Sequence, residues 1–343
     1  MHQLKRRNQA QAIDASELDA LLDDYLTGSD FAAKTRINYG LALLPFRVFW
    51  ASYAPTHDYK LSRASFADFD RWYQREYVNG AGRHPSAFML ARTGRVLQQF
   101  MTWLHQEGCT DLDLGGWIIR HRNEPTAQYW PTMQDLQQLF DRMPSTIDRL
   151  RNVAMLAIAL STGARRMEIA SLCAEQVHFD SPITQLDLGG AHGGWCELTV
   201  TKGGKRRIVA FDGVAGLLLK CHLRTSGTIE GRIFRMTDNG VALAVARICK
   251  AADLPEMSAH ALRRAFAEHF ANAHSGDIVA MQLLKLQMGH SLANDVTTSH
   301  YVNLRNERAV LDKLRQYHTS PLVAITFDWQ SYPVHIPTKE IER

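Results

Sequence analysis

The sequence predicts a mainly α-helical protein of two domains that carries one small β-hairpin. Three observations indicate this fold class. The chain has 343 residues, which is too long for one ordinary hydrophobic core. Apolar residues recur at helical spacing along most of its length. The stretch CELTVTKGGKRRIVAF differs, because two strand-like runs flank a Gly-Gly centre, which is typical of a β-hairpin.

Residues 15–110 are predicted to form an all-helical domain, and residues 1–14 before it are interpreted as a flexible lead. In the third helical stretch we expect Ser65 to be the N-cap and Gly80 to end the helix. The stretches with helical periodicity are ELDALLDDYLTG (17–28), AAKTRINYGLALLPFRVFWASY (32–53), SFADFDRWYQREYVNG (65–80) and PSAFMLARTGRVLQQFMTWLHQEG (85–108).

Residues 111–130 lack helical periodicity and contain a Gly pair, so they are interpreted as a linker between the domains. The second domain is expected at residues 131–318. It begins with a helix capped by Thr132 and includes an apolar helix that stops at Gly163. Residues 319–343 combine apolar side chains with three prolines, so we expect an extended tail that could be exchanged between protomers.

Composition narrows the classes of function. No apolar run approaches the roughly 20 residues of a membrane span, and the N-terminus lacks an apolar signal segment, so we expect a cytoplasmic protein without a membrane partner. The five scattered cysteines indicate no disulfide framework. Five histidines between 260 and 300 lack the spacing of zinc ligands, so neither a metal nor another cofactor is expected. The net charge of +4 permits a nucleic-acid partner without arguing for one.

The stretch STGARRMEIASL places Arg165 and Arg166 at the expected start of a helix, just after Gly163. The free backbone N–H groups of a helix N-terminus favour a phosphate, and a nearby arginine adds to this. Glu168 follows Arg165 by three residues, where it could hold the guanidinium in a fork-like pair. Taken alone, such a pair is more often an ordinary ion pair of the protein surface.

Two further stretches carry basic residues. In HALRRAF, His260 and Arg263 are three residues apart and share one helical face, which suits an oxyanion. The hairpin tip TKGGKRR contains Lys202 and Lys205, and it is either a solvated turn or a segment that reaches a DNA groove. A lysine close to arginines has its charged form disfavoured, which suits a proton donor.

The stretch MGHSLANDVTTSHYV places His290 after a glycine and Tyr301 eleven residues later. Tyr301 is either a packing residue or a nucleophile. A phenol has a pKa near 10, so a nucleophilic tyrosine needs a base or surrounding positive charge.

In their order along the chain, TGARRMEIASL, TKGGKRRIV, HALRRAFAEHF and MGHSLANDVTTSHYV resemble the tyrosine recombinases, the family that includes Xer proteins and phage integrases. The resemblance covers about residues 150–305. It implies an all-helical core-binding domain followed by a mixed α/β catalytic domain. Two departures are the extra cation Arg166 and an interval from His290 to Tyr301 that is about two residues longer than usual for the family.

The resemblance implies a site-specific recombinase that forms a 3′-phosphotyrosyl intermediate and exchanges strands through a Holliday junction without metal or ATP. Tyr301 would be the nucleophile, the two arginines would bind the scissile phosphate, and the lysine would protonate the leaving oxygen. The implied catalytic set is Tyr301, Arg165, Lys202, His260, Arg263 and His290.

The implied partners are a double-stranded DNA recombination site, further copies of the chain in a tetrameric synapse, and an accessory protein or second recombinase. A mobile element is the expected context. Two alternatives remain open, a type IB topoisomerase and a DNA-binding regulator without catalysis. The candidate DNA contacts are Lys34, Arg36, Arg92 and Arg95 in the first domain, Arg120 and Arg122 in the linker, and Lys205 and Arg207 in the hairpin.

Overall fold

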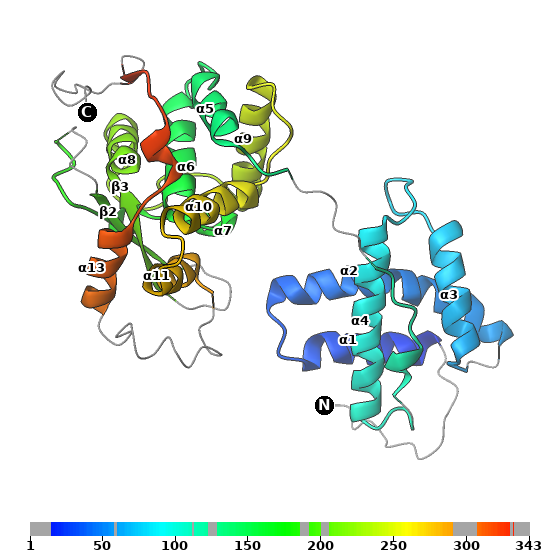
Figure 1. Ribbon diagram of the computed structural model, residues 1–343. Coiled ribbons are helices and arrows are strands. Elements are labelled where there is room, and N and C mark those ends of the chain that lie inside the picture. Colours follow the sequence, from blue (N-terminus) through cyan, green and yellow to red (C-terminus); the bar gives the residue numbers. More distant parts are fainter. Residues whose placement is uncertain are drawn as a thin grey trace. The chain divides into compact units, whose positions relative to one another are not determined.

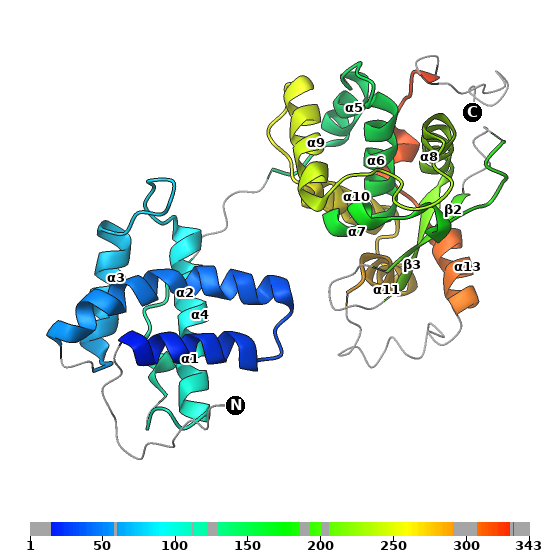
Figure 2. The same ribbon diagram turned by 180° about the vertical axis from the view of Figure 1, so that it is seen from behind.

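The protein is described here by a computed structural model, which describes residues 15–57, 60–111, 113–122, 129–185, 192–199, 206–290, 307–329 and 332. The chain divides into two compact units, residues 1–127 and residues 128–343 (Figures 1 and 2). The predicted lead at residues 1–14 lies outside the described residues, as do Lys202, Lys205 and Tyr301.

The first unit is helical throughout its described part. Its helix α4 packs against α1, α2 and the short turn η2, and α2 also contacts α3. Trp50, Phe46 and Phe100 are completely buried, and they lie in a core that is rich in aromatic rings. The elements are α1 (Ala15–Gly28), α2 (Ala33–Tyr53), η1 (Ala54–Thr56), α3 (Arg63–Arg75), α4 (Ala87–Gln106) and η2 (Leu114–Trp117).

Helix α3 begins and ends earlier than the sequence suggested. Its N-cap is Ser62 and not Ser65, and it ends at Arg75 and not at Gly80. The Ser62 hydroxyl accepts a hydrogen bond from the Ser65 N–H (3.1 Å), and the Ser65 hydroxyl accepts one from the Ser62 N–H (2.8 Å). Ser62 and Ser65 therefore form a capping box, in which Ser65 is the third residue of the helix. The sequence pattern had not singled out Ser62.

Part of the expected linker belongs to the first unit. Leu114 and Ile118 are buried in its core, although residues 111–130 were interpreted as an interdomain segment. The first glycine of the pair that suggested a linker has a packing role, because a Cβ on Gly115 would come within 3.0 Å of the Gln98 carbonyl oxygen on α4. Gly115 allows the chain to approach a helix closely, so the interpretation of this part of the segment as an interdomain linker was wrong.

The second unit combines helices with a small sheet. Helix α6 is its central element, since every residue from Val153 to Thr162 is buried, and α8 and α10 lie beside it (Figure 1). The elements are α5 (Met133–Asp141), α6 (Arg149–Thr162), α7 (Arg166–Ser171), η3 (Ala174–Gln176), β1 (Val177–Phe179), β2 (His192–Leu198), β3 (Arg207–Asp212), α8 (Gly213–Ser226), α9 (Asp238–Ala251), α10 (Ala259–Ala273), α11 (Ile278–Met288), α13 (Glu307–Tyr317) and η4 (Pro321–Ala324).

The three-stranded antiparallel sheet has the order β1-β2-β3. The β2–β3 pair is the expected hairpin, with Leu198 opposite Arg207 as the last pair before the connecting residues 199–206. Strand β3 contacts α6 and α8 as well as α11 and α13. The predicted fold class, mainly helical with a small sheet, is confirmed.

Two predicted helix boundaries of the second unit are confirmed. The Thr132 side chain accepts a hydrogen bond from the Asp135 N–H (3.2 Å) at the start of α5. Helix α6 stops at Gly163, whose φ of 61° is left-handed. This conformation disfavours any residue other than glycine. A Cβ on Gly163 would in addition lie 2.7 Å from the Phe266 ring.

The described part of the C-terminal segment is not an extended tail. Leu322, Phe327 and Tyr332 are buried in the core of their own unit, and the Phe327 ring lies 5.0 Å from that of Phe140. The Thr326 N–H donates to the Gln137 side chain, whose amide donates back to the Thr326 carbonyl, both at 2.8 Å. The expectation that this segment lies outside the core is therefore wrong for residues 321–329 and 332. The three prolines suggested an extended segment, but η4 packs against α6, α5, α8 and α10, which no local pattern reports.

Within the part of the chain that the structure describes, no helix has both the length and the apolar character needed to cross a bilayer.

Candidate active site

Arg165 stands where α6 ends and α7 begins. The left-handed turn at Gly163 redirects the chain, and Arg165 then adopts an extended conformation as the N-cap of α7. Its backbone N–H donates to Glu168 Oε2 (2.6 Å) and its Nη1 to Glu168 Oε1 (3.1 Å). The expected contact between these two residues is present, and the Arg165 side chain remains 30% exposed.

Arg263 and His260 both come from α10, which Ser258 caps at its N-terminus. Arg263 is only 2% exposed. Its Nη1 donates to the Gly163 carbonyl (2.5 Å) and its Nη2 to the Met288 carbonyl. Burial, followed by the charges of Arg165 and Arg207, lowers the pKa of Arg263 to about 10, so the guanidinium stays charged at neutral pH.

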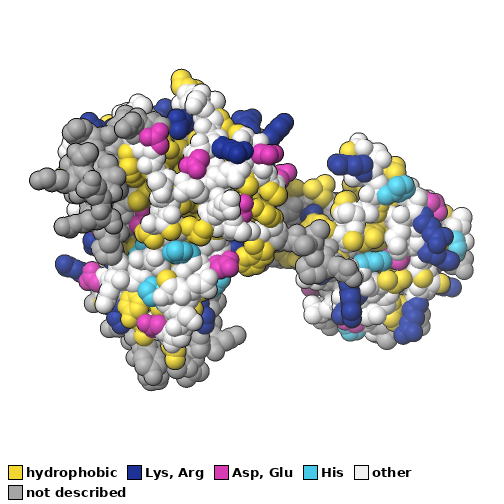
Figure 3. Space-filling model, turned by 45° about the horizontal axis from the view of Figure 1, so that its top comes forward, with side chains coloured by type: hydrophobic (Ala, Val, Ile, Leu, Met, Phe, Trp, Pro, Cys, Tyr) yellow, Lys and Arg dark blue, Asp and Glu magenta, His cyan; other side chains and the backbone are white. Residues whose placement is uncertain are grey.

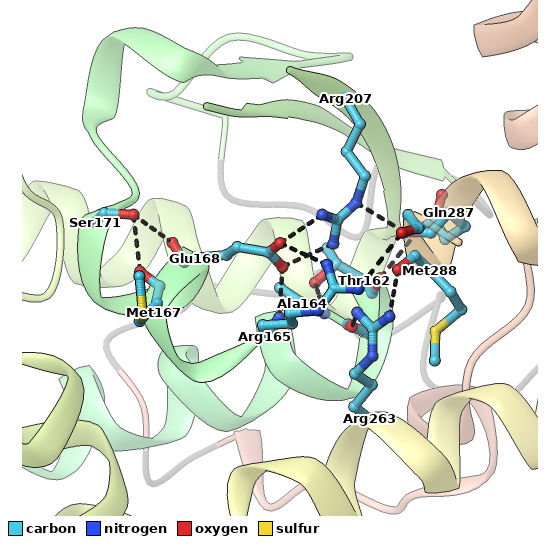
Figure 4. A network of polar contacts seen from close by, with 12 residues as sticks. Thr162, Ala164, Arg165, Met167, Glu168, Ser171, Arg207, Arg263, Gln287 and Met288 are labelled. Atoms are coloured by element: carbon cyan, nitrogen blue, oxygen red, sulfur yellow. Dashed lines mark hydrogen bonds and ion pairs between the residues drawn. The ribbon is translucent and has the colours of Figure 1, made fainter. Parts of the chain in front are cut away.

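The C-terminus of α11 draws three guanidinium groups together (Figure 4). Arg207 Nε donates to the Gln287 carbonyl (3.1 Å), Arg263 to the Met288 carbonyl, and Arg165 Nη2 to the Gly289 carbonyl (3.4 Å). The last carbonyls of a helix have no partner within it and carry partial negative charge, which suits cations.

His290 follows this helix end directly. Its backbone N–H donates to the Lys285 carbonyl (2.9 Å), after Gly289 has turned the chain with a φ of 63°. Burial first, and then the charges of Arg263 and Arg165, lower the pKa of His290. Burial first, and then the charges of Arg264 and Arg263, lower the pKa of His260. Both imidazoles are therefore neutral at pH 7 and able to accept or donate a proton.

Arg165, Arg166, His260 and Arg263 line one open pocket of about 600 Å³. Arg166, the extra cation, pairs with Asp238 on α9 (Nη2 to Oδ2, 3.1 Å). Elements far apart in the sequence thus place basic groups around one concave surface, an arrangement suited to stabilising a phosphate that gains negative charge. Among the described residues no cluster of His, Cys, Asp and Glu is placed to hold a metal ion.

Arg207 is not the DNA contact that the sequence suggested. Its side chain is 10% exposed, and it forms the fork-like pair with Glu168 that was expected of Arg165 (Nη1–Oε1 2.5 Å, Nη2–Oε2 2.7 Å). A buried guanidinium engaged in this way is not available to a DNA backbone. Glu168, the one carboxylate in TGARRMEIASL, indicates that a cation lies near it. Which cation forms the pair depends on strand β3, which is remote in sequence.

The first unit carries four of the candidate DNA contacts. Lys34, Arg36 and Arg95 are exposed, whereas Arg92 is half-buried and donates to the Asn38 carbonyl (2.6 Å). Arg92 and Arg95 line a second open pocket, of about 540 Å³, between α2 and α4. Several Lys and Arg side chains are exposed on the face of this unit in Figure 3. Arg120 and Arg122 are also exposed.

Comparisons with known proteins agree with this fold. Residues 130–308 match the phage integrase family. The chain is 30% identical to the tyrosine recombinase XerD of Ralstonia nicotianae over 66% of its own length and 73% of that protein. It is 26% identical to the tyrosine recombinase XerC of Roseiflexus castenholzii, over 66% and 71%.

Two solved structures of lambda integrase have a similar fold. One is a dimer bound to a COC′ core site, with a TM-score of 0.58, 17% identity, and coverage of 85% of this chain and 77% of that one. The other is a tetramer bound to a Holliday junction, with a TM-score of 0.57, 17% identity and coverage of 85% and 77%.

The fold, the cluster of basic residues and the relatives together define an enzyme that breaks and rejoins DNA strands. Because the family match covers more than half of the chain, the protein belongs to the phage integrase family and is a site-specific tyrosine recombinase. Neither of the two alternative functions, topoisomerase or non-catalytic regulator, has support from these relatives.

Proposed function

We propose that the pocket beside Arg165, His260, Arg263 and His290 holds the scissile phosphate of a DNA recombination site. The observation that carries this proposal is the convergence of two guanidinium groups and two imidazoles of lowered pKa from separate elements. Arg165 and Arg263 bind the non-bridging oxygens, and His290 donates a further hydrogen bond to them. Preorganised donors of this kind typically contribute about 2.7–4 kcal/mol each to lowering a barrier.

Tyr301 is the nucleophile in this proposal. Its phenolic oxygen attacks phosphorus, the bond from phosphorus to the 5′-oxygen breaks, and the phenolic proton passes to His260. Lys202 protonates the departing 5′-oxygen. The product is a 3′-phosphotyrosyl link with a free 5′-hydroxyl. Tyr301 and Lys202 lie outside the described part of the chain, and their roles are assigned from the family resemblance.

The covalent link retains the energy of the phosphodiester, so rejoining needs no ATP. A 5′-hydroxyl from a second duplex attacks the phosphotyrosyl group and releases the tyrosine. Two such exchanges in sequence pass through a Holliday junction and complete recombination.

Exchange between two duplexes requires four active sites, so we propose a tetramer of this chain on DNA, with an accessory protein or second recombinase as a further partner. The lambda integrase tetramer on a Holliday junction supports this assembly. We place its action in the cytoplasm, where a mobile element meets its target DNA. The proposed DNA contacts are Lys34, Arg36, Arg92, Arg95, Arg120, Arg122 and Lys205.

A nicked suicide substrate tests the nucleophile. When cleavage releases a short fragment, the covalent adduct accumulates and is visible as a shifted band on a denaturing gel. We expect the unchanged chain to form the adduct and Tyr301→Phe to form none, because phenylalanine has no attacking oxygen.

Tyr317→Phe is the matched control. Tyr317 lies at the end of α13, where its ring packs near His274 (5.6 Å), and we expect this variant to form the adduct normally. An adduct that persists in Tyr301→Phe, or one lost in Tyr317→Phe, would contradict the assignment.

A further inference from the structure

Glu168 is a fully buried carboxylate held by two arginines. Its side chain is 1% exposed, and four hydrogen bonds reach it. Arg207 supplies two of them with Nη1 and Nη2, while Arg165 supplies one from its backbone N–H and one from Nη1 (Figure 4). An ionised carboxylate has about four acceptor sites, so this group is saturated.

The two arginines are bound to Glu168 unequally. Arg207 takes the two-point fork with both carboxylate oxygens, at 2.5 and 2.7 Å, and is itself nearly buried. The Arg165 guanidinium makes only one contact with this carboxylate, at the longer distance of 3.1 Å, and its side chain stays 30% exposed towards the pocket. A buried charge without a full partner is costly. Without Arg207, the carboxylate would therefore draw the Arg165 guanidinium inwards.

Arg207 also joins this carboxylate to the segment that leads into His290. Its Nε donates to the Gln287 carbonyl at the end of α11 (3.1 Å). Its guanidinium lies against Gly289, where an added Cβ would come within 2.9 Å of Nη1. One strand residue thus contacts both the carboxylate beneath Arg165 and the residue before His290.

We propose that Arg207 is a positioning residue for strand cleavage, which satisfies Glu168 so that Arg165 remains free to bind the phosphate. This inference rests on the proposed function of Arg165. Arg207 contacts no DNA in this arrangement, and its effect on the reaction passes through the placement of Arg165.

The test measures single-turnover cleavage of two substrates, one with an ordinary scissile phosphodiester and one with a methylphosphonate at that position. The methylphosphonate lacks one negative charge, so it depends less on an arginine. We expect Arg207→Met to slow phosphodiester cleavage about 10- to 100-fold, by analogy with the loss of a residue that orients a metal ligand. On the methylphosphonate substrate, we expect the ratio of the cleavage rates of the unchanged chain and this variant to be severalfold smaller.

Two further variants separate positioning from folding. Arg207→Lys keeps the charge but cannot form the fork, so we expect it to keep the thermal stability better than Arg207→Met while still cleaving slowly. Arg224→Met removes an exposed arginine on α8 and serves as the matched control, with an unchanged rate expected on both substrates.

An equal deficit of Arg207→Met on both substrates would overturn the proposal, because a general loss of structure affects both alike. Full activity of Arg207→Lys would overturn it as well. Failure of the proposed function is separately visible, as a covalent adduct that forms with Tyr301→Phe.

Discussion

The two units of this recombinase are built on different principles. The described residues of the first unit fully bury only Ser65 and Thr93 among polar side chains, and aromatic rings fill its core. The second unit fully buries charged side chains as well, and these are Glu168, Asp212, Lys220 and Arg263. An apolar core gains stability from every side chain removed from water, whereas a buried charge costs stability unless it is paired.

For Glu168 and Arg263, which lie at the candidate site, the difference fits a requirement of the chemistry rather than of stability. Buried ion pairs are often no more stabilising than well-packed apolar residues. The second unit nevertheless keeps Glu168 and its two arginines at the centre of its site. Departures of this kind from simple packing are expected at functional sites. The following predictions test this contrast, from the largest expected effect to the smallest.

Phe100→Ala tests the apolar core. Phe100 is completely buried on α4, and we expect its truncation to lower the free energy of unfolding of the first unit by about 3–5 kcal/mol. The loss should be the same at pH 7 and pH 4, because its neighbour Tyr25, with a pKa raised by burial to about 12, stays neutral throughout. Urea denaturation followed by hydrogen exchange in α1–α4 measures this.

The control lies on the same helix. Phe88 is 58% exposed, so Phe88→Ala should change the stability by no more than about 0.5 kcal/mol. A similar loss from both variants would mean that the core does not hold this unit together.

Glu168→Gln tests the charged core. At neutral pH we expect the free energy of unfolding of the second unit to fall by about 3–5 kcal/mol, because Arg207 is left buried without its charged partner. Burial raises the pKa of Glu168, but the hydrogen bonds and charge of Arg207, followed by the hydrogen bonds of Arg165, outweigh it and hold the pKa below 4.5.

This lowered pKa makes the loss dependent on pH. A carboxyl whose pKa is depressed by folding contributes stability above its ordinary value, and this contribution disappears as the pH falls through the folded value. The difference in the free energy of unfolding between Glu168→Gln and the unchanged chain should therefore decrease below pH 4.5. Urea denaturation at several pH values would measure it. A gap that stays constant in acid, or an equal effect of Glu268→Gln on the exposed side of α10, would contradict this account.

Arg165→Ala tests catalysis directly. We expect strand cleavage to fall about 10²- to 10³-fold, because one preorganised donor to the phosphate is lost, while affinity for the DNA site is retained. Cleavage of the suicide substrate and a gel-shift titration measure the two quantities. Arg166→Ala, next to it but paired with Asp238, should keep most of the cleavage rate. A loss of binding without a loss of cleavage would remove Arg165 from the active site.

Arg95→Ala should have the smallest effect. Arg95 is exposed on α4, and as a phosphate contact its loss would weaken DNA binding for all sequences alike. We expect the slope of log affinity against log salt to decrease by about 1. Arg47→Ala is the matched control, because Arg47 already pairs with Asp19. This substitution should leave the slope unchanged. An unchanged slope in Arg95→Ala would exclude this face as a DNA contact.

Local signals in the sequence predicted a large part of the fold. The Thr132 cap, the stop at Gly163 and the β2–β3 hairpin depend on neighbouring residues, and each was found where it was expected. Strand β1 was missed, because three residues are too few to show alternation. Ser62 was missed as a cap because Ser65, three residues later, offers the same hydroxyl.

The candidate site was only partly predictable. Arg165, His260, Arg263 and His290 were named from the order of short motifs along the chain and from the resemblance of these motifs to the tyrosine recombinases. Arg207 was assigned to DNA because a hairpin tip rich in basic residues could reach into a DNA groove. Its burial follows from the packing of β3 against α11, which no local pattern reports.

The sequence by itself determined which residues could carry the chemistry, since residue type and spacing are local properties of the chain. Only the tertiary structure decided how the charges are shared. Whether Arg165 or Arg207 takes the fork on Glu168 depends on which guanidinium the folded strand, helix end and turn bring within about 3 Å, a distance at which ionic hydrogen bonds become strong.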